Sequence, residues 1–415
     1  MGSTSEAWRP LGGGLTVGRS SRAEWTFDDD RMSSLHASIR PSAGAFIVED
    51  LGSTNGTFLD GERLAGPTLA AAGSVVRAGR AVLVIEPDLE ILSADDEPPV
   101  EMAGRFHTPA LVHALGVASR TGKHLLLAGE SGTGKELCAQ RLAADLGRNG
   151  PLVAHNCARF ASADEAETTL FGVGRGVFSG VDARKGLLEE ADDGVLFLDE
   201  LHALPLRVQR SLLRFVEDGM HARIGASGAR RLSVRLVLAT NHPLDAPELA
   251  PDLVARLFRI EVPALSRRRA DIPDILLAAL GKSAQDAGID GRALALALGP
   301  DHFEALCLAD LSGRNVRALE AIAAEMVARA ARAPDPPERI VRRVFGDHLA
   351  GSVVRERGDA EKSGSLYEAN RARIVEAYRS TGQNLSETER VLRAAGLPVN
   401  RRWLTIYLRR WGSRS

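Results

Sequence analysis

The chain has 415 residues, and at about 150 residues per domain this length predicts roughly three domains. Its hydrophobic fraction of 44% and charged fraction of 26% are typical of globular chains, and the formal net charge of −2 by itself favours no class of partner. Three cysteines without a C-x-x-C pair argue against a disulfide framework or a zinc site, and the absence of a long apolar run or signal-peptide core predicts a cytoplasmic protein with no membrane partner.

The first part of the chain has the pattern of a β-rich domain. Short apolar runs alternate with Gly, Asp, Asn and Pro clusters from Leu11 to Glu86, which predicts an all-β sandwich within a first domain at residues 1–92. The acidic stretch S-A-D-D-E-P-P at Ser93 cannot bury an apolar face. We therefore expect a linker over residues 93–104.

The middle of the chain has the pattern of an α/β domain followed by helices. Continuous apolar strands alternate with helical patterns over residues 105–265, which is typical of a parallel sheet covered on both faces. The pattern becomes wholly helical over residues 266–332, which predicts a lid. Three prolines then break the helical pattern, so we expect a second linker over residues 333–365.

The last segment, residues 366–415, reads as three short helices. Its stretch from Leu366 to Ser415 holds ten Arg against four Glu, a local charge of +6. Nucleic acid is the natural partner of such a basic segment.

A phosphate-binding loop is predicted by G-E-S-G-T-G-K-E, because this motif follows an apolar strand and opens a helix. Its glycines let backbone N–H groups face phosphates, and Lys135 would meet the β- and γ-phosphates of ATP. Glu136 stands where the general pattern has Ser or Thr, so Mg²⁺ must be held more by a second acidic motif. A plain glycine-rich turn is the alternative. The candidate ATP-binding residues of this loop are Gly129, Glu130, Ser131, Gly132, Thr133, Gly134, Lys135 and Glu136.

Two acidic residues end the strand V-L-F-L-D-E, and parallel α/β sheets bind ligands at this carboxyl end. Asp199 is the candidate ligand of Mg²⁺, and Glu200 is placed to polarise the water that attacks the γ-phosphate. Thr240 and Asn241 end the next such strand and are candidates to sense that phosphate or to orient the water. A strand merely capped by two acids is the alternative.

The stretch from about Phe106 to Arg332 resembles the AAA+ module of sigma-54-dependent transcription activators, also called bacterial enhancer-binding proteins. The resemblance implies an ATPase that assembles as a dimer up to a hexamer-like ring, uses ATP and Mg²⁺, and remodels the closed complex of sigma-54 RNA polymerase at a promoter. Besides the motifs above, it is carried by H-N-C-A at His155, L-F-G at Leu170, P-L-R-V-Q-R-S-L-L-R at Pro205, R-R-R-A-D-I-P at Arg267 and N-V-R-A-L-E at Asn315.

The same resemblance assigns roles to three further residues. Asn156 is similar to the asparagine that restrains the catalytic glutamate, Arg317 to the lid arginine that reaches the nucleotide, and Arg256 to a trans-acting arginine finger. An ordinary strand-end asparagine and a surface ion pair are the alternatives for Asn156 and Arg256. The family usually has another finger where this chain has Ala250. If Ala250 replaces the catalytic finger, ATP hydrolysis would be nearly abolished.

A glycine-rich loop at residues 172–186 suits a projecting segment, because its glycines disfavour a stable helix. Within it, G-V-F-S-G-V resembles the G-A-F-T-G-A loop with which the family touches sigma-54. The implied contact residues are Gly176, Phe178, Ser179 and Gly180. A loop phenylalanine unrelated to sigma-54 is the alternative.

The first domain resembles a forkhead-associated (FHA) module, through V-G-R-S at Val17, M-S-S-L-H-A at Met32 and L-G-S-T-N-G-T-F at Leu51. The resemblance implies binding of a phosphothreonine protein or peptide. Arg19 and Ser33 would grip the phosphate, Asn55 would hold the peptide backbone, and His36 would brace the pocket. Ser34 is the remaining candidate and stands where the family often has Arg or Lys. A sandwich that only packs on the ATPase is the alternative.

The C-terminal helices resemble the Fis-type helix-turn-helix, through G-Q-N-L-S at Gly382 and N-R-R-W-L at Asn400. The resemblance implies DNA binding at upstream, enhancer-like sites. Arg401, Arg402 and Thr405 would open the recognition helix in the major groove, while Arg409 and Arg410 suit phosphates. A merely solvated basic helix is the alternative.

Together these motifs predict an ATP-dependent activator of sigma-54 transcription that is switched by threonine phosphorylation. The alternative is a DNA-bound, phosphopeptide-responsive regulator whose AAA+ module binds ATP for assembly, hydrolyses it poorly and does not engage sigma-54. The first function is favoured by intact Lys135, Asp199, Glu200, Asn241 and Arg256, whereas Ala250 and the altered loop favour the second.

Overall fold

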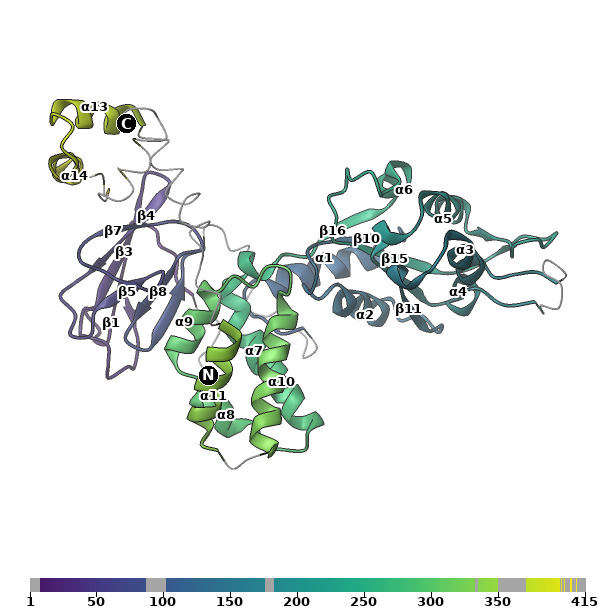
Figure 1. Ribbon diagram of the computed structural model, residues 1–415, viewed down its shortest axis with the longest axis horizontal. Coiled ribbons are helices and arrows are strands. Elements are labelled where there is room, and N and C mark those ends of the chain that lie inside the picture. The colour runs from purple at the N-terminus through teal and green to yellow at the C-terminus, as the bar shows by residue number, and fades with distance from the viewer. Residues whose placement is uncertain are drawn as a thin grey trace. The chain divides into compact units, whose positions relative to one another are not determined.

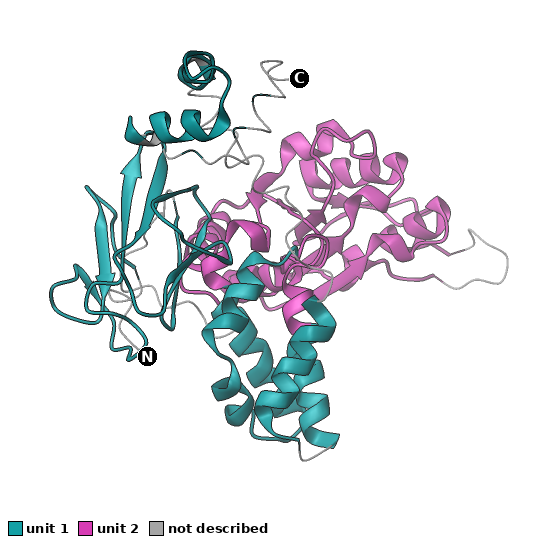
Figure 2. Cartoon of the chain, turned by 60° about the vertical axis from the view of Figure 1, so that its left-hand side comes forward, with its two compact units in different colours: residues 1–94, 272–310, 321–415 teal, residues 95–271, 311–320 magenta. Residues whose placement is uncertain are grey.

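The computed structural model describes residues 8–86, 102–175, 183–332, 335–349 and 371–395, together with residues 397, 399, 404 and 408. The chain divides into two compact units (Figure 2). Unit 1 comprises residues 1–94, 272–310 and 321–415, and unit 2 comprises residues 95–271 and 311–320. Within the described residues, no helix combines the length and apolar character that crossing a membrane requires.

The N-terminal part of unit 1 is the predicted all-β sandwich (Figure 1). One sheet has the order β2-β1-β3-β4-β7 and the other the order β6-β5-β8-β9. Apolar side chains on the inner faces form the core, among them Val17, Val48 and Val76, none of which is exposed. The strands are β1 Leu15–Gly18, β2 Trp25–Thr26, β3 Ala37–Ser42, β4 Ala45–Asp50, β5 Thr57–Leu59, β6 Glu62–Arg63, β7 Thr68–Ala70, β8 Val75–Ala78 and β9 Ala81–Val84.

Unit 2 is the predicted α/β domain, built on a parallel five-stranded sheet with the order β11-β12-β15-β10-β16. Its central strands read as continuous apolar runs because helices bury both faces of the sheet. The strands are β10 Leu125–Ala128, β11 Leu152–Asn156, β12 Val195–Asp199, β15 Arg235–Thr240 and β16 Phe258–Glu261. The helices are α1 Thr108–Arg120, α2 Lys135–Leu146, α3 Ala163–Phe171, α4 Leu187–Glu190, α5 Leu206–Asp218 and α6 Pro251–Arg256.

Short elements complete unit 2. A two-stranded ribbon pairs β13 Met220–His221 with β14 Arg230–Arg231. The 3₁₀ turns are η2 Cys157–Arg159, η3 Leu201–Ala203, η4 Leu265–Arg267 and η5 Arg269–Asp271.

The lid helices are α7 Ile272–Asp286, α8 Arg292–Ala297, α9 Pro300–Leu308, α10 Val316–Arg332 and α11 Pro337–Leu349. Helix α11 corrects the expectation of a linker over residues 333–365, because part of that stretch is helical. Pro337 is tolerated at the first helical position, where the missing N–H has no helical partner. Ile340, Val341, Val344 and Phe345 then recur at helical spacing and are buried.

Two C-terminal helices of unit 1 are α13 Arg371–Ser380 and α14 Leu385–Ala394, and Leu404 and Leu408 are also helical. Ile374, Tyr378 and Leu392 pack with these leucines in a small core. Thr388 is fully buried in this region, and its hydroxyl is satisfied by the carbonyl of Asn384 and by the hydroxyl of Thr381.

Candidate functional site

The predicted nucleotide residues follow strand ends at one edge of the parallel sheet. The register pairs Ala128 at the end of β10 with Thr240 at the end of β15. It also pairs Asn156 at the end of β11 with Asp199 at the end of β12. The phosphate-loop motif, the acidic pair and Asn241 therefore follow the carboxyl ends of neighbouring strands, where open α/β sheets bind ligands.

The phosphate-loop motif forms a tight turn between β10 and α2. Gly132 and Gly134 have φ values of 74° and 98°, in the left-handed region that favours glycine. A Cβ atom on Gly132 would also collide with the carbonyl oxygen of Arg314. The loop thus needs glycine both for its turns and for its close approach to the segment before α10.

Lys135 begins α2 with only 8% of its surface exposed. Its Nζ donates hydrogen bonds of 2.8 Å to the carbonyl oxygens of Gly129 and Glu130. Burial lowers the pKa of Lys135, and the nearby carboxylate of Asp199 opposes this shift. A cation is thereby held inside the loop that is predicted to receive phosphates.

The acidic pair at the end of β12 contains a backbone outlier. Glu200 has a φ of 56°, and its N–H donates a 2.9 Å hydrogen bond to Oδ1 of Asp199. A left-handed glutamate costs energy and is found mainly where the surrounding structure enforces it, as at functional sites. Next to this pair in the sheet order, Thr240 is buried and accepts a hydrogen bond from the N–H of His242, while Asn241 is exposed.

Asn156 is engaged locally. Its side-chain oxygen accepts a 2.9 Å hydrogen bond from the N–H of Ala158 and so caps η2. A bond from Asn156 to Glu200 is not among the hydrogen bonds of the described residues. In this structure Asn156 has the geometry of a strand-end asparagine, which was the alternative to its switch role.

The segment that leads into α10 contacts the phosphate loop. Nη1 of Arg317 donates a 3.2 Å hydrogen bond to Oγ of Ser131, which brings this predicted lid arginine to the loop. Asn315, only 1% exposed, donates to the Glu130 carboxylate and to the Ser131 carbonyl at 3.0 and 2.9 Å. Its oxygen accepts from the N–H of Leu265 at 2.8 Å.

Arg268 is a second anchor of the phosphate loop, and Asp271 anchors the segment that leads into α1. Nη2 of the buried Arg268 donates a 2.7 Å hydrogen bond to the carbonyl of Thr133. Asp271 accepts hydrogen bonds from the backbone N–H groups of Phe106, His107 and Thr108, which lead into α1. Burial lowers the pKa of Arg268 and raises that of Asp271.

Asn315, Arg268 and Asp271 are not among the site residues predicted from the sequence. The motifs R-R-R-A-D-I-P and N-V-R-A-L-E contain all three and were the available signal.

Arg256 lies at the end of α6 and pairs with Glu217 at 3.1 Å, with both side chains well exposed. Within one chain this is the surface ion pair that was the alternative to a finger. Ala250 is 5% exposed, and its N–H donates a 2.8 Å hydrogen bond to the buried side chain of Gln209. Position 250 is therefore part of the core.

The sigma-54 contact residues Gly176, Phe178, Ser179 and Gly180 lie outside the described residues. The described base of their loop is anchored, because Val173 bridges to Arg184 and to Ile224. Beside this base, the carboxylate of Glu189 accepts bonds from Arg223, Arg230 and His221. The hydrogen bonds from Arg223 contribute most to lowering the pKa of Glu189 to about 2.

The candidate phosphopeptide residues lie on loops of the sandwich. The N–H of Ser33 donates to Nδ1 of the buried His36 at 3.0 Å, and Nε2 of this ring donates to the carbonyl of Gly56 at 3.2 Å. Oγ of Ser33 accepts from the N–H of Thr54 at 3.1 Å. The His36 ring thus connects the loop that contains Ser33 with the loop that contains Gly56.

The outer residues of these loops are open to solvent. Asn55 donates to the carbonyl of Arg31 at 2.6 Å. Arg19 and Ser34 are exposed, and the described part of the chain provides no ion pair for Arg19. The predicted DNA-contact residues Arg401, Arg402, Thr405, Arg409 and Arg410 lie outside the described residues.

The α/β domain and the β-sandwich each match a known family. Residues 106–263 match the family described as Sigma-54 interaction domain, and residues 15–79 match the FHA domain. The nitric oxide reductase transcription regulator NorR1 of Cupriavidus necator is 34% identical over 375 residues, covering 86% of this chain and 69% of NorR1. The chain belongs to the NtrC-like sigma-54 activator family.

Other relatives of this activator family match smaller parts. The DNA-binding transcriptional regulator NtrC of Salmonella typhimurium is 37% identical over 208 residues, covering 48% of this chain. The match spans 44% of the length of NtrC. Among solved structures, NtrX of Brucella abortus in complex with ADP is 26% identical, with a TM-score of 0.53, and the match covers 76% of this chain and 69% of NtrX.

Proposed function

We propose that this chain is an ATP-driven activator of sigma-54 RNA polymerase, controlled by a phosphothreonine signal and bound to DNA through its C-terminal helices. The observation that carries the proposal is the single edge of the parallel sheet that gathers the phosphate loop, Asp199, Glu200 and Asn241. NtrX, whose fold is similar, has been solved with ADP and with ATP, which supports a nucleotide at this edge.

The residues of this edge fit ATP with Mg²⁺. Gly132 and Gly134 allow the loop to turn its N–H groups toward phosphates, and the buried Lys135 adds a charge. Asp199 would hold Mg²⁺, which neutralises phosphate charge when bound. Glu200 would orient or deprotonate the attacking water. Its left-handed backbone conformation sets the direction in which the side chain leaves the main chain.

Hydrolysis in this proposal depends on a neighbouring subunit. Arg256 is exposed at the end of α6, so it is free to exchange Glu217 for the nucleotide of an adjoining chain. The test is steady-state ATP turnover over a range of protein concentrations. We expect the activity per chain to rise with concentration in the wild type and to stay low in Arg256→Gln, by a factor on the order of 10³. Arg207→Gln, which removes another exposed paired arginine, is the control.

A second candidate function is favoured by the buried Ala250, since this position cannot present a finger. In that case the chain binds ATP for assembly and hydrolyses it poorly. Concentration-independent, near-background turnover of an assembled wild type would replace the first proposal with this one.

Phe178 provides the test of sigma-54 engagement. The sequence places this phenyl group within a glycine-rich segment, and burial against a partner best explains an apolar side chain there. With nucleotide, aluminium fluoride and magnesium, we expect the wild type to capture sigma-54. Phe178→Ala should abolish capture and open-complex formation while leaving ATP turnover near wild type. An active wild-type ATPase that captures no sigma-54 would contradict this part of the proposal.

The DNA-binding part is tested by a pair of tail arginines. We expect Arg409→Ala to weaken all duplex sequences alike and to lower the slope of log affinity against log salt by about 0.9, as for one phosphate contact. Arg401→Ala should instead relax sequence preference. Identical behaviour of both variants in a gel-shift series would contradict the groove assignment.

A further inference from the structure

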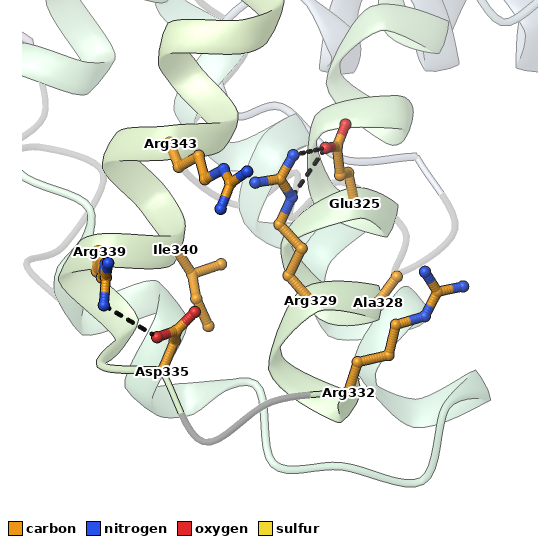
Figure 3. Close-up of a pocket in the computed structure, with 8 residues that line it drawn as sticks. All are labelled: Glu325, Ala328, Arg329, Arg332, Asp335, Arg339, Ile340 and Arg343. Carbon is orange, nitrogen blue, oxygen red and sulfur yellow. Dashed lines mark hydrogen bonds and ion pairs between the residues drawn. The ribbon is translucent and has the colours of Figure 1, made fainter.

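A cavity of about 560 Å³ lies between α10 and α11, and none of the residues assigned above lines it (Figure 3). This volume is in the range of small-molecule sites. Four of the lining residues are arginines and two are acids, which gives the wall a net formal charge of +2. The lining residues are Glu325, Ala328, Arg329, Arg332, Asp335, Arg339, Ile340 and Arg343.

Two of the arginines have carboxylate partners. Arg329 donates to Glu325 at 2.9 and 2.5 Å and to Asp347 at 2.8 Å, and Arg339 pairs with Asp335 at 3.4 Å. Arg332 and Arg343 form no ion pair with any described residue. The cavity wall therefore contains guanidinium charge that the described part of the chain does not neutralise.

The Arg329 guanidinium has groups of opposite charge on its two sides. Figure 3 shows Glu325 on one side of the Arg329 guanidinium and the Arg343 guanidinium, from α11, pointing toward its other side. Arg329 is already neutralised by Glu325 and Asp347, whereas Arg343 has no ion-pair partner among the described residues, so an anion beside Arg343 would meet an unpaired charge. Because Glu325 also accepts a 2.6 Å hydrogen bond from Nε2 of His348, the fork of Arg329 is fixed before any ligand arrives.

We propose that this cavity binds a small phosphate monoester. The phosphate would lie between Arg329 and Arg343, because guanidinium forks match phosphate oxygens in geometry and charge. A monoester phosphate carries a charge of about −1.5 to −2 near neutral pH, opposite in sign to the net charge of the lining residues. Ala328 and Ile340 offer apolar contacts to the organic part of such a ligand.

The test uses the full chain with Lys135→Ala and Arg19→Ala, so that the two other predicted phosphate sites are removed. Phenyl phosphate is titrated by calorimetry, with phenyl sulfate as the monoanion of similar shape and inorganic phosphate as the ligand without an organic part. We expect saturable binding of phenyl phosphate, weaker binding of inorganic phosphate, and little binding of phenyl sulfate. Adding Arg343→Gln should lower the phenyl phosphate affinity at least about tenfold.

Arg342→Gln is the matched control, because Arg342 is an exposed neighbour on α11 that does not line the cavity. It should leave the affinity unchanged. Absence of saturable binding, or equal affinities in the Arg343→Gln and Arg342→Gln proteins, would overturn the proposal. It would also be overturned if phenyl phosphate failed to bind while Arg343→Gln weakened duplex DNA binding, since α11 would then contact a nucleic-acid backbone.

Discussion

The nucleotide motifs and the phosphopeptide motifs of this chain are held in place by different kinds of structure. In unit 2 the candidate residues directly follow β10, β12 and β15, whose apolar side chains are buried on both faces of the sheet. In the sandwich of unit 1 the candidate residues lie on loops, and side chains such as His36 and Ser33 join these loops.

This difference has a physical consequence. A residue at the end of a buried parallel strand is positioned by main-chain register, which many apolar contacts enforce together. A residue on a loop depends on a few individual hydrogen bonds, each worth about 1 kcal/mol. Single substitutions away from the ligand should therefore disturb the phosphopeptide loops more than the nucleotide edge.

The largest effects are expected at the carboxyl ends of β10 and β12, called the nucleotide edge, where Lys135 is predicted to bind phosphate and Glu200 to act on water. Lys135→Ala should abolish nucleotide binding, because it removes the buried charge inside the phosphate loop. Glu200→Gln should keep binding and lower ATP turnover by about 10² to 10⁴, since it removes a group that works on water and not on phosphate. Fluorescent-nucleotide titration and steady-state turnover separate the two effects.

The matched control is Glu190→Gln, which changes an exposed acid of unit 2 at the end of α4. It should alter turnover much less than Glu200→Gln. Normal turnover in Glu200→Gln would contradict a catalytic role for Glu200. It would also show that a position at the end of a buried strand does not by itself indicate a catalytic residue.

A smaller loss is expected at the phosphopeptide loops. We expect a phosphothreonine peptide to bind and its unphosphorylated twin to show no measurable binding. Arg19→Ala should lower the phosphopeptide affinity by about 10- to 100-fold, as for loss of a charge-assisted hydrogen bond. Arg22→Ala, at another exposed arginine, is the control for general charge. Equal calorimetric affinities of both peptides for the wild type would contradict the phosphoreader hypothesis.

Glu189 tests whether the base of the glycine-rich loop is as firmly fixed as the sheet. Glu189→Gln removes the carboxylate that pairs with Arg223 and leaves Arg230 with Asp192 at 3.6 Å, and we expect a loss of about 2 kcal/mol in unfolding free energy. Because the folded pKa of Glu189 is about 2, below its usual 4.5, its stabilisation is present above pH 4.5 and lost as the pH falls toward 2.

The measurement for Glu189 is denaturant unfolding of wild type and variant at several pH values. Their stabilities should differ at pH 7 and converge as the solution becomes acidic. Asp164→Asn, which breaks the exposed pair with Arg207, should change neither stability nor its pH dependence. A difference for Glu189→Gln that persists undiminished at low pH would show that the ion pairs are not its cause.

The sequence predicted those parts of the fold and site that depend on local patterns. Apolar runs predicted the strands, and the residues after them predicted the nucleotide edge. The anchors Asn315 and Arg268 were not predicted, because their partners are distant: Leu265 lies 50 residues from Asn315, and Thr133 lies 135 residues from Arg268. Such pairings arise only from the tertiary fold.

Two local features were also misjudged or left open. Prolines near Ala333 favoured a linker, but Pro337 begins α11, whose buried Val341 and Val344 follow helical spacing. For Asn156 the sequence left two roles open, a restraint on Glu200 and an ordinary strand-end asparagine, and in the structure its side chain caps η2. A capping asparagine and a catalytic switch have the same sequence at a strand end, so only contacts separate them.

The smallest effects are expected for two side chains that hold loops in place, His36 in the sandwich and Asn315 in unit 2. His36→Ala removes the bonds to Ser33 and Gly56 and should lower phosphopeptide affinity about fivefold, the equivalent of about one neutral hydrogen bond. Asn315→Gly removes the bonds to Glu130, Ser131 and Leu265, but glycine tolerates the backbone φ of 46° at this position.

We expect Asn315→Gly to lower ATP affinity by less than His36→Ala lowers phosphopeptide affinity. The reason is that β10 and α2 still hold the phosphate loop at both of its ends, and Arg268 still donates to Thr133. Calorimetric titration of both variants in the full chain, each beside the wild type, measures the two ratios under one set of conditions. A larger loss for Asn315→Gly would mean that this single side chain, and not the register of the sheet, positions the phosphate loop.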